Sequence, residues 1–297
     1  MAEEKDGGVG EVSWSHIPFE DIEMGERIGG GGAGMIFRGW YKGEPVALKT
    51  LFDSRIGEDL KKEYMDELLV LSKVKHTNIV KFIGACMTPP NLCFIMEMCE
   101  GSLFNLIHVE KAGFSERDVI KMAVDIGSAL EYLHAVKPAA IIHRDIKSHN
   151  ILRAVDGTMK LCDFGLVKVR NTQAGTPAYM APELLEGKSF NKSVDVYAFG
   201  VLLCEMFTAE VPFYGVEINS IRERVLGGDR PNCPSYAMPP RCQRLIQKCW
   251  HQRSDQRPDF TTIVDELLDI YEELPEGKFT DVVKSQGGDA LDSLMFK

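Results

Sequence analysis

The sequence HRDIKSHN at residues 143–150, followed after a gap of twelve residues by DFG at 163–165, carries the strongest signal in this chain. These two stretches supply two carboxylates, Asp145 and Asp163, and one amide, Asn150. Asp145 can orient an attacking hydroxyl and accept its proton, while Asp163 and Asn150 can hold the metal ions that neutralise charge on phosphates. The pattern therefore indicates in-line phosphoryl transfer from a magnesium nucleotide.

A glycine-rich segment near the N-terminus offers a binding site for the phosphates. Residues 28–36 read IGGGGAGMI and fit the pattern G-x-G-x-x-G, which dinucleotide-binding folds share. A dinucleotide loop opens a helix, whereas Met35–Trp40 and Pro45–Leu51 have the composition of two strands. Glycines between strands let the backbone close over phosphates. Four of them in a row also add ordering entropy, which counts against tight nucleotide affinity.

The composition limits the classes of protein to which the chain can belong. Its 297 residues carry a net charge of -10, and this argues against a general nucleic-acid binder, which needs a basic face. The eight cysteines contain no C-x-x-C pair, so we expect reduced cytosolic thiols rather than a zinc site or disulfides. The longest apolar run, within Val194–Phe207, is interrupted by Asp195 and Glu205. It is too short and too charged to span a bilayer, and we expect a buried helix.

The order of the patterns predicts two lobes. Residues 1–12 are polar and are expected to be disordered, whereas Trp14, Ile17, Phe19 and Ile22 are expected to anchor the fold. Strands are predicted between residues 23 and 51, a helix at 57–75, and further strands at Ile79–Ile83 and Leu92–Met98. The predicted helices after Gly101 are Glu116–Val136, Val194–Thr208, Ile218–Leu226, Gln243–Cys249 and Phe260–Glu273. A small β-rich half thus precedes a larger helical half, with the junction near Glu97–Gly101.

Together these motifs resemble the protein kinases, and the resemblance covers roughly Ile22 to Leu274. It implies an α+β bilobal fold, with a small antiparallel N-lobe carrying one main helix and a larger, mostly helical C-lobe. The implied boundaries are a flexible lead-in at 1–20, an N-lobe at 21–98, a hinge at 97–101, a C-lobe at 101–275 and an acidic tail at 276–297.

The resemblance also implies a phosphate-binding lysine paired with a helix carboxylate. Lys49 ends the apolar run Val46-Ala47-Leu48-Lys49, although a lone lysine is nearly always a solvated surface group. Glu67 is the best candidate partner, because it lies nine residues before HTNIV at 76–80, as in the family. Asp66 is offset by about 100° around the helix, whereas Glu63 lies on a neighbouring face and stays an alternative.

The family pattern carries over to a complete set of site residues. The implied catalytic residues are Asp145, Lys147, Lys49, Glu67, Asn150, Asp163 and Thr176. The implied metal ligands are Asn150 and Asp163, and the implied cofactors are ATP and Mg²⁺, with Mn²⁺ as an alternative ion. The implied nucleotide-binding residues are Ile28, Gly29, Gly30, Gly31, Gly32, Ala33, Gly34, Ile36, Ala47, Lys49, Met96, Glu97, Cys99, Leu152 and Cys162.

Further residues are implied to have structural roles. Leu71, Phe82, His143 and Phe164 would stack as an apolar spine that links the lobes. Asp195 would brace the catalytic loop, and Glu183 of the segment GTPAYMAPE (175–183) would be buried against Arg257.

The segment between Gly165 and Ala181 is only fifteen residues long and contains three hydroxyls, on Thr172, Thr176 and Tyr179. Arg144 implies a basic pocket for a phosphate on this segment. Thr176 is expected to orient the substrate and the Asp145–Lys147 pair, and Tyr179 is expected to be packed. An upstream kinase would therefore act on Thr172, whose phosphate would pair with Arg144 and with Lys168 or Arg170.

Cys162 directly precedes Asp163 and is expected at the floor of the nucleotide site. Nearby positive charge would lower the pKa of its thiol and make it reactive, whereas burial would raise the pKa and make it inert. Both outcomes are open at this point.

Within the kinases, Lys147-Ser148, Lys248-Cys249-Trp250 and RPDF at 257–260 look most like the tyrosine-kinase-like group, near Raf and the mixed-lineage kinases. The implied function is a signalling serine/threonine kinase that transfers the γ-phosphoryl of MgATP to a protein hydroxyl. Its expected partners are ATP and a protein substrate, and we expect neither nucleic-acid binding nor a membrane span. Its expected location is the cytoplasm, and shuttling to the nucleus is compatible with the sequence. The alternatives are a pseudokinase scaffold, a dual-specificity kinase and a small-molecule kinase.

Overall fold

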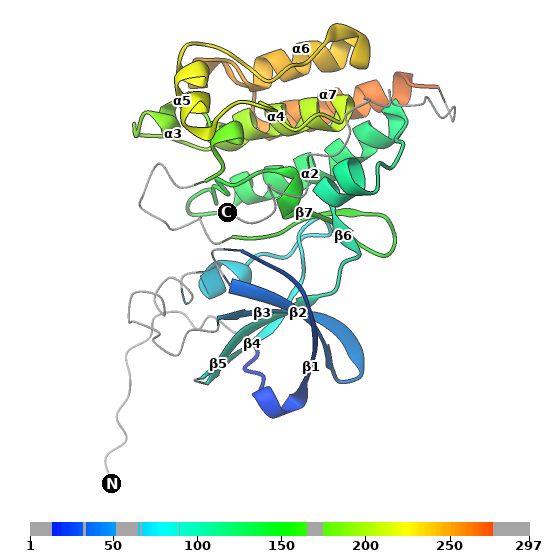
Figure 1. Ribbon diagram of the computed structural model, residues 1–297, viewed down its shortest axis with the longest axis vertical. Coiled ribbons are helices and arrows are strands. Elements are labelled where there is room, and N and C mark those ends of the chain that lie inside the picture. The colour runs from blue at the N-terminus through cyan, green and yellow to red at the C-terminus, as the bar shows by residue number, and fades with distance from the viewer. Residues whose placement is uncertain are drawn as a thin grey trace.

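The computed structural model describes residues 14–31, 34–51, 65, 67–88, 90–164 and 175–275. A small lobe built around a five-stranded sheet lies at one end of the molecule, and a larger helical lobe lies at the other (Figure 1). Between them runs a second, three-stranded sheet. The structure therefore has the α+β, two-lobed architecture that the motifs predicted.

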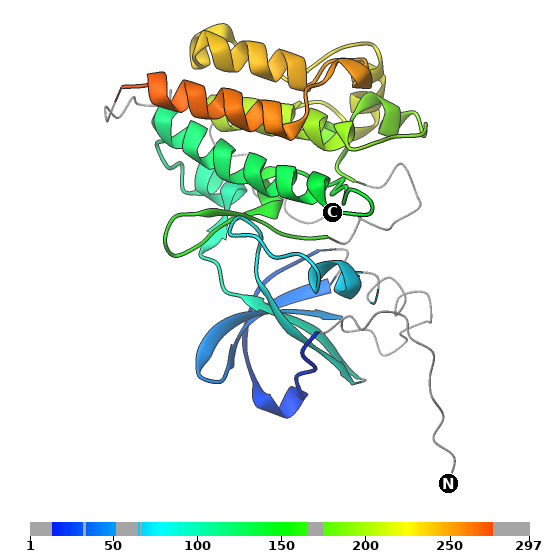
Figure 2. The ribbon, with the colours of Figure 1, turned by 180° about the vertical axis from the view of Figure 1, so that it is seen from behind.

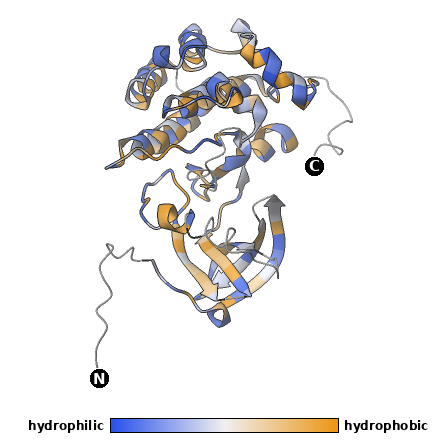
Figure 3. Cartoon of the chain, turned by 90° about the vertical axis from the view of Figure 1, so that its left-hand side faces the viewer, coloured by the Kyte–Doolittle hydropathy of each residue, from blue (hydrophilic) through white to orange (hydrophobic). Residues whose placement is uncertain are grey.

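The sheet of the small lobe is wholly antiparallel, with strand order β1-β2-β3-β5-β4. Its strands are β1 (Ile22–Gly31), β2 (Gly34–Tyr41), β3 (Glu44–Leu51), β4 (Phe82–Thr88) and β5 (Asn91–Glu97). In Figure 3 some strands of this sheet are coloured mostly hydrophobic, whereas the helices of the large lobe alternate between hydrophobic and hydrophilic residues. On β3, Val46 and Leu48 pack in one apolar cluster on one face of the sheet. Because side chains alternate along a strand, Ala47 and Lys49 project together from the other face.

The N-terminal segment joins the sheet earlier than the expected domain start at residue 21. The backbone of Ile17 donates a hydrogen bond to Ala85 on β4, and Ala85 donates to Ser15, at 2.9 and 3.1 Å. A Cβ at Gly84 would lie 2.5 Å from the carbonyl oxygen of Ser15, so glycine is required for this close approach. Residues 15–17 thus pair with the sheet, although they lie within the predicted lead-in at 1–20. Ile17 and Ile22 are buried, as expected of anchors.

The large lobe is organised around a central helix, α4 (Ser193–Thr208), in which every residue from Ser193 to Phe207 is buried. The predicted apolar run is thus a buried helix. Helices α2 (Glu116–Ala135) and α7 (Phe260–Glu273) lie side by side (Figure 2), and α2 also contacts α4. The other helices are α3 (Pro182–Leu185), α5 (Ile218–Leu226) and α6 (Pro240–Cys249). In the part of the chain that the structure describes, no helix combines the length and the apolar character needed to cross a membrane.

Two features at the junction of the lobes differ from the prediction. The strand expected at Ile79–Ile83 begins at Phe82, and Ile79 forms only an isolated bridge to Leu161. The second sheet was not predicted, because its strands β6 (Gly101–Ser102), β7 (Ile151–Arg153) and β8 (Met159–Leu161) are too short to show an alternating pattern.

The remaining elements are single turns. The 3₁₀ turns are η1 (Phe19–Asp21), η3 (Ser148–Asn150), η4 (Pro177–Tyr179), η5 (Ser235–Ala237) and η6 (Ser254–Gln256), and η2 (Asn105–Val109) is a π-helix. Residues 67–71 are also helical and belong to the helix expected at 57–75.

A buried ion pair joins α3 to the loop before α7. Arg257 donates to both carboxylate oxygens of Glu183, at 2.6 and 2.9 Å, and its side chain is fully buried. Since removing one partner leaves a buried charge uncompensated, we expect Arg257→Met to lower the free energy of unfolding by about 3–5 kcal/mol. Arg257→Lys should recover little, because an ammonium cannot replace the two-pronged contact.

Denaturant titration followed by circular dichroism measures this effect. The matched control is Arg253→Met, which removes the exposed Arg253–Asp255 pair and should cost less than about 1 kcal/mol. Equal losses for Arg257→Met and Arg253→Met would contradict a stabilising role for the buried pair.

Candidate active site

One lysine joins the two lobes through two carboxylates. The Lys49 Nζ on β3 donates to Glu67 Oε1 at 2.7 Å and to Asp163 Oδ1 at 3.1 Å. Glu67 lies on the helix of the small lobe, whereas Asp163 follows β8 of the large lobe. The structure therefore brings together three residues that lie far apart in the sequence, and it places Glu67 as a partner of Lys49. The alternative partner, Glu63, lies outside the described residues.

Lys49 and its two carboxylate partners influence one another's protonation. Burial opposes protonation of Lys49, but the carboxylates of Asp163 and Glu67 outweigh it and raise the pKa of the ammonium, which is therefore charged. Burial raises the pKa of Glu67, and the ammonium of Lys49 opposes that rise. Lys49 is thus an ammonium shared between two carboxylates, one from each lobe.

A second hydrogen-bonded group surrounds Asp145. Lys147 Nζ lies 2.8 Å from Asp145 Oδ2, and it also donates to Thr176 Oγ1 at 2.9 Å. Thr176 Oγ1 in turn donates to Asp145 Oδ1 at 3.1 Å. Asn150 Nδ2 donates to Asp145 Oδ2 at 2.9 Å and to the Asp145 carbonyl at 2.8 Å. These contacts hold the carboxylate of Asp145 in a fixed orientation, with a basic group and a hydroxyl beside it.

Asp163 and Asn150 provide oxygen ligands that fit a divalent cation. The side-chain nitrogen Nδ2 of Asn150 donates its hydrogen bonds to Asp145. The side-chain oxygen Oδ1 is therefore the atom of this amide that can bind a cation. The backbone N–H of Cys162 donates to the backbone carbonyl of Asn150 at 3.0 Å, which ties the catalytic loop (143–150) to the metal loop, the segment that begins at Cys162 and Asp163. Hard oxygen ligands of this kind are those that Mg²⁺ prefers. Asp163 also has a positive φ of 63°, a strained conformation that is common at functional sites.

Asp195, near the start of α4, binds the backbone of the catalytic loop. Its carboxylate accepts hydrogen bonds from the backbone N–H groups of His143 and Arg144, at 2.9 and 2.8 Å, and lies 2.8 Å from His134 Nε2. Asp195 is fully buried. The φ of Arg144 is 70°, and these bonds stabilise the strained turn that it forms.

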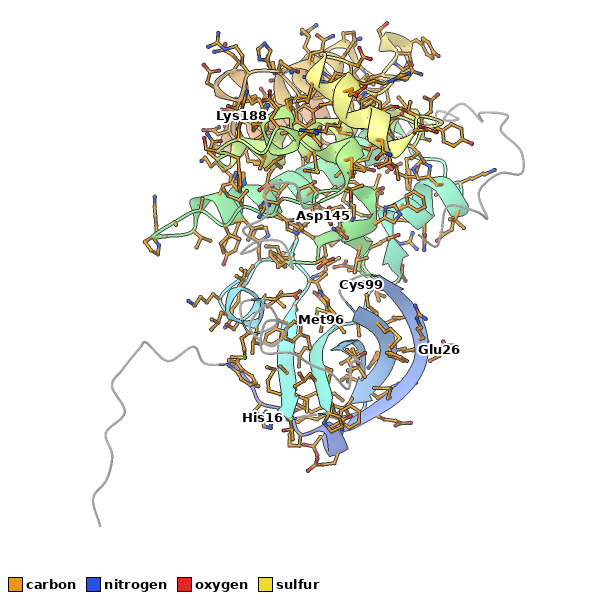
Figure 4. The ribbon with its side chains drawn as sticks, turned by 60° about the vertical axis from the view of Figure 1, so that its left-hand side comes forward. His16, Glu26, Met96, Cys99, Asp145 and Lys188 are labelled. Carbon is orange, nitrogen blue, oxygen red and sulfur yellow. The ribbon has the colours of Figure 1, made fainter. Side chains whose placement is uncertain are left out.

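The residues expected to bind the base and the phosphates lie on the facing ends of the two lobes. Ala47 on β3 lies opposite Met96 on β5, and Leu152 on β7 pairs with Ser102 on β6. Met96 and Cys99 lie at the end of the small lobe that faces Asp145 (Figure 4). The strand β5 ends at Glu97, and the chain then passes to the large lobe.

The described part of the glycine-rich segment forms the end of β1 and the start of β2. Gly29 pairs with Ile36 and Gly31 pairs with Gly34, while Gly30 lies between them. Ile28 is 45% exposed, although it is a large apolar residue. Several expected site residues lie outside the described residues: Gly32, Ala33, Gly165, Lys168, Arg170 and Thr172.

The apolar spine is present as a stack of packed side chains. Leu71 and Phe164 are buried in the main apolar cluster, and Phe82 packs against it. The rings of His143 and Phe164 meet edge to face at 5.1 Å. His143 also contacts the carbonyl of Cys162 at 3.0 Å. The catalytic loop and the metal loop are thus packed against each other as well as hydrogen-bonded.

A buried hydrogen-bond network that includes Ser148 of the catalytic loop was not predicted from the sequence. The carboxylate of Glu205 on α4 contacts His108, Ser148 and Tyr179 at 2.7–2.9 Å. The prediction that Tyr179 is packed agrees with its burial. The available signal was Glu205 itself, a charged residue within an apolar run, because a buried carboxylate needs several donors. It was interpreted only as an interruption of that run.

Cys162 is chemically different from a thiol activated by positive charge. Burial raises the pKa of the Cys162 thiol, Asp163 raises it further, and the opposing influence of Lys49 is smaller. Of the two outcomes that the sequence left open, the structure therefore supports the raised pKa of a buried thiol. All eight cysteines of the chain are free thiols.

We expect Cys162 to be nearly inert, because a raised pKa leaves little of the nucleophilic thiolate near neutral pH. Iodoacetamide at pH 8 should modify Cys162 at least about tenfold more slowly than a thiol with the ordinary pKa near 8.5. Peptide mapping after timed quenching measures the rate, with the urea-unfolded chain as the control. Labelling in the folded chain as fast as in the unfolded chain would contradict the expectation.

Comparison with known proteins agrees with this geometry. The protein kinase domain family matches residues 22–268, so the chain belongs to that family. It is 35% identical to the serine/threonine-protein kinase STY46 of Arabidopsis thaliana over 276 residues, which are 90% of this chain and 46% of that protein. It is 37% identical to a probable serine/threonine-protein kinase of Dictyostelium discoideum over 87% of this chain and 28% of that protein. It is also 33% identical to the Arabidopsis serine/threonine-protein kinase STY17, over 87% and 46%. The chain thus spans less than half the length of these relatives.

Proposed function

We propose that the chain is an active serine/threonine protein kinase of the tyrosine-kinase-like group, which transfers the γ-phosphoryl of ATP to a hydroxyl of a protein substrate. The observation that supports this most is the pairing of Lys49 with both Glu67 and Asp163 across the two lobes. The names of the relatives, which are serine/threonine-protein kinases, support the choice of acceptor.

In this proposal each charged group has one task. Lys49, held charged by its two carboxylates, binds the phosphates of the nucleotide. Asp163 and the side-chain carbonyl oxygen of Asn150 would hold Mg²⁺, or Mn²⁺ in its place. The metal, when bound, supplies the positive charge that neutralises the phosphates. The adenine is covered by five apolar side chains, those of Ile28, Ile36, Ala47, Met96 and Leu152. Binding of the adenine would therefore bury the exposed side chain of Ile28.

Asp145 orients the acceptor hydroxyl and accepts its proton, within the fixed position that Lys147, Asn150 and Thr176 give it. Lys147 contacts both Asp145 and Thr176, so its ammonium lies where charge develops during transfer. The backbone carbonyl of Glu97 and the amide of Cys99 would pair with the edge of the adenine.

The pseudokinase alternative is less well supported, because a scaffold has no need of a lysine paired with two carboxylates or of an oriented Asp145. A small-molecule kinase has no need of the segment around Thr176, which here is bonded to the catalytic group. The regulatory phosphate that we propose at Thr172, and its upstream kinase, remain proposals from the sequence. A cytoplasmic location is proposed on the same basis.

The acceptor can be tested with three peptides that are identical except for Ser, Thr or Tyr at the acceptor position. Purified enzyme with MgATP should phosphorylate the Ser and Thr peptides at least about tenfold faster than the Tyr peptide, a difference of about 1.4 kcal/mol in the barrier. Asp163→Asn is the matched inactive control. Faster transfer to Tyr would overturn the serine/threonine assignment, and an absence of transfer to peptides and to the chain itself would favour the pseudokinase.

A further inference from the structure

The carboxylate of Glu205 on α4 connects three segments of the large lobe, which carry His108, Ser148 and Tyr179. His108 Nε2 and Ser148 Oγ lie 2.9 and 2.7 Å from Glu205 Oε1, and the Tyr179 hydroxyl donates to Glu205 Oε2 at 2.7 Å. Glu205 and Ser148 are fully buried, and His108 nearly so. Burial and the adjacent carboxylate raise the pKa of Tyr179 well above its usual value, so its phenol stays a hydrogen-bond donor. A buried carboxylate is costly unless several donors satisfy it, so the three segments depend on one another.

The position of Ser148 gives this network its relevance to the site. Ser148 directly follows Lys147, which contacts Asp145, and lies two residues before Asn150. Asn150 is bonded in turn to the backbone of Cys162, next to Asp163. A displacement of Ser148 would therefore reach both the proposed base and the proposed metal ligands.

The segment that carries His108 contacts the catalytic loop by a second route. The ring of Phe104 stacks on His149 with a centroid distance of 3.9 Å, and it lies 4.6 Å from the ring of His108. His108 belongs to the π-helix η2, a rare conformation that is often found at functional sites. This π-turn places Leu106, Ile107 and His108 in the core in succession.

We propose that His108 is a positioning residue for phosphoryl transfer, which acts through Glu205 to hold Ser148 and thereby the catalytic loop. The proposal rests on the proposed kinase function only for its effect on rate. Its structural part is that His108 lowers the amide hydrogen exchange of residues 146–150, and this does not depend on any activity. Histidine suits this place because its Nε2–H can donate to a carboxylate from within an apolar core.

The test compares His108→Leu, which removes the donor, with His108→Gln, whose amide can still reach Glu205. Amide hydrogen exchange of the intact chain, followed by mass spectrometry, reports the catalytic loop without any substrate. His108→Leu should raise exchange in peptides covering 146–150 about tenfold or more, the scale of one lost hydrogen bond to a charged group. In His108→Gln the exchange should return most of the way to that of the wild type.

Kinetics provide the second readout. His108→Leu should lower kcat about tenfold or more, because a displaced catalytic group loses its alignment, while the KM for ATP stays within about twofold. His76→Leu is the matched control, since it removes a half-buried histidine that stacks on Tyr132 away from this network. It should leave the exchange of residues 146–150 and kcat unchanged.

Ser148→Ala keeps the test decisive if His108→Leu does not fold. It removes only the hydroxyl that binds Glu205, and it should produce the same local rise in exchange. Unchanged exchange in folded His108→Leu or Ser148→Ala, a rise spread evenly over the large lobe, or a His108→Gln as impaired as His108→Leu would each overturn the proposal. If the wild type transfers no phosphate, the proposed function fails, and the exchange comparison still decides the role of His108.

Discussion

Asp145→Asn is expected to lower the turnover of phosphoryl transfer about 10²–10⁴-fold, the usual scale for a general acid–base group. The amide is nearly the same size and can keep some contacts with Thr176 and Asn150, but it cannot accept the proton of the acceptor hydroxyl. Nucleotide binding should stay mostly intact, because Asp145 contacts neither Lys49 nor Asp163 among the contacts that the structure gives for it.

Steady-state kinetics and nucleotide titration on the same preparation separate these two effects. The control is Asp156→Asn, which changes an exposed aspartate in the turn between β7 and β8. A turnover of Asp145→Asn close to that of the wild type would contradict the assignment of Asp145 as the base.

Lys49→Met is expected to cost about 10²–10³-fold in turnover, the loss seen when one preorganised electrostatic group is removed. The substitution takes away the ammonium that contacts both Glu67 and Asp163. Glu67→Gln should be impaired less, because Asp163 still contacts Lys49. Since the pKa of Lys49 is raised, its ammonium should stay charged through pH 9 and should not cause an alkaline loss of activity.

Turnover measured from pH 6 to 9 for the wild type, Lys49→Met and Glu67→Gln tests this ordering. Equal impairment of the two variants would argue that Asp163 does not hold Lys49 in the active enzyme. An activity of Lys49→Met within about threefold of the wild type would contradict the phosphate-binding role, which implies a loss of several kcal/mol.

Much of the site could be predicted because its chemistry is encoded in short, closely spaced motifs. The spacing from Glu67 to the strand that follows was enough to choose it as the partner of Lys49, and the structure shows that contact. The pairs Asp195 with the catalytic loop and Glu183 with Arg257 were predicted for the same reason. In each case the resemblance to the kinase family supplied the pairing, and the structure shows the contact.

The parts that were not predicted depend on tertiary packing. The strands β6–β8 have two or three residues each, so no alternating pattern can reveal them. The sign of the pKa shift of Cys162 depends on burial against nearby charge, and burial cannot be read from the residue's neighbours in sequence. The role of Glu205 depends on donors that lie 26 to 97 residues away along the chain.

With saturating MgATP, a single-turnover measurement of ³²P transfer from γ-labelled ATP to a protein substrate should show rapid transfer by the wild type. Asp145→Asn should bind nucleotide with similar affinity but transfer phosphate about 10²–10⁴-fold more slowly. Equal rates for the two proteins, or no transfer by a wild type that binds MgATP, would contradict the claim that the group around Asp145 catalyses phosphoryl transfer.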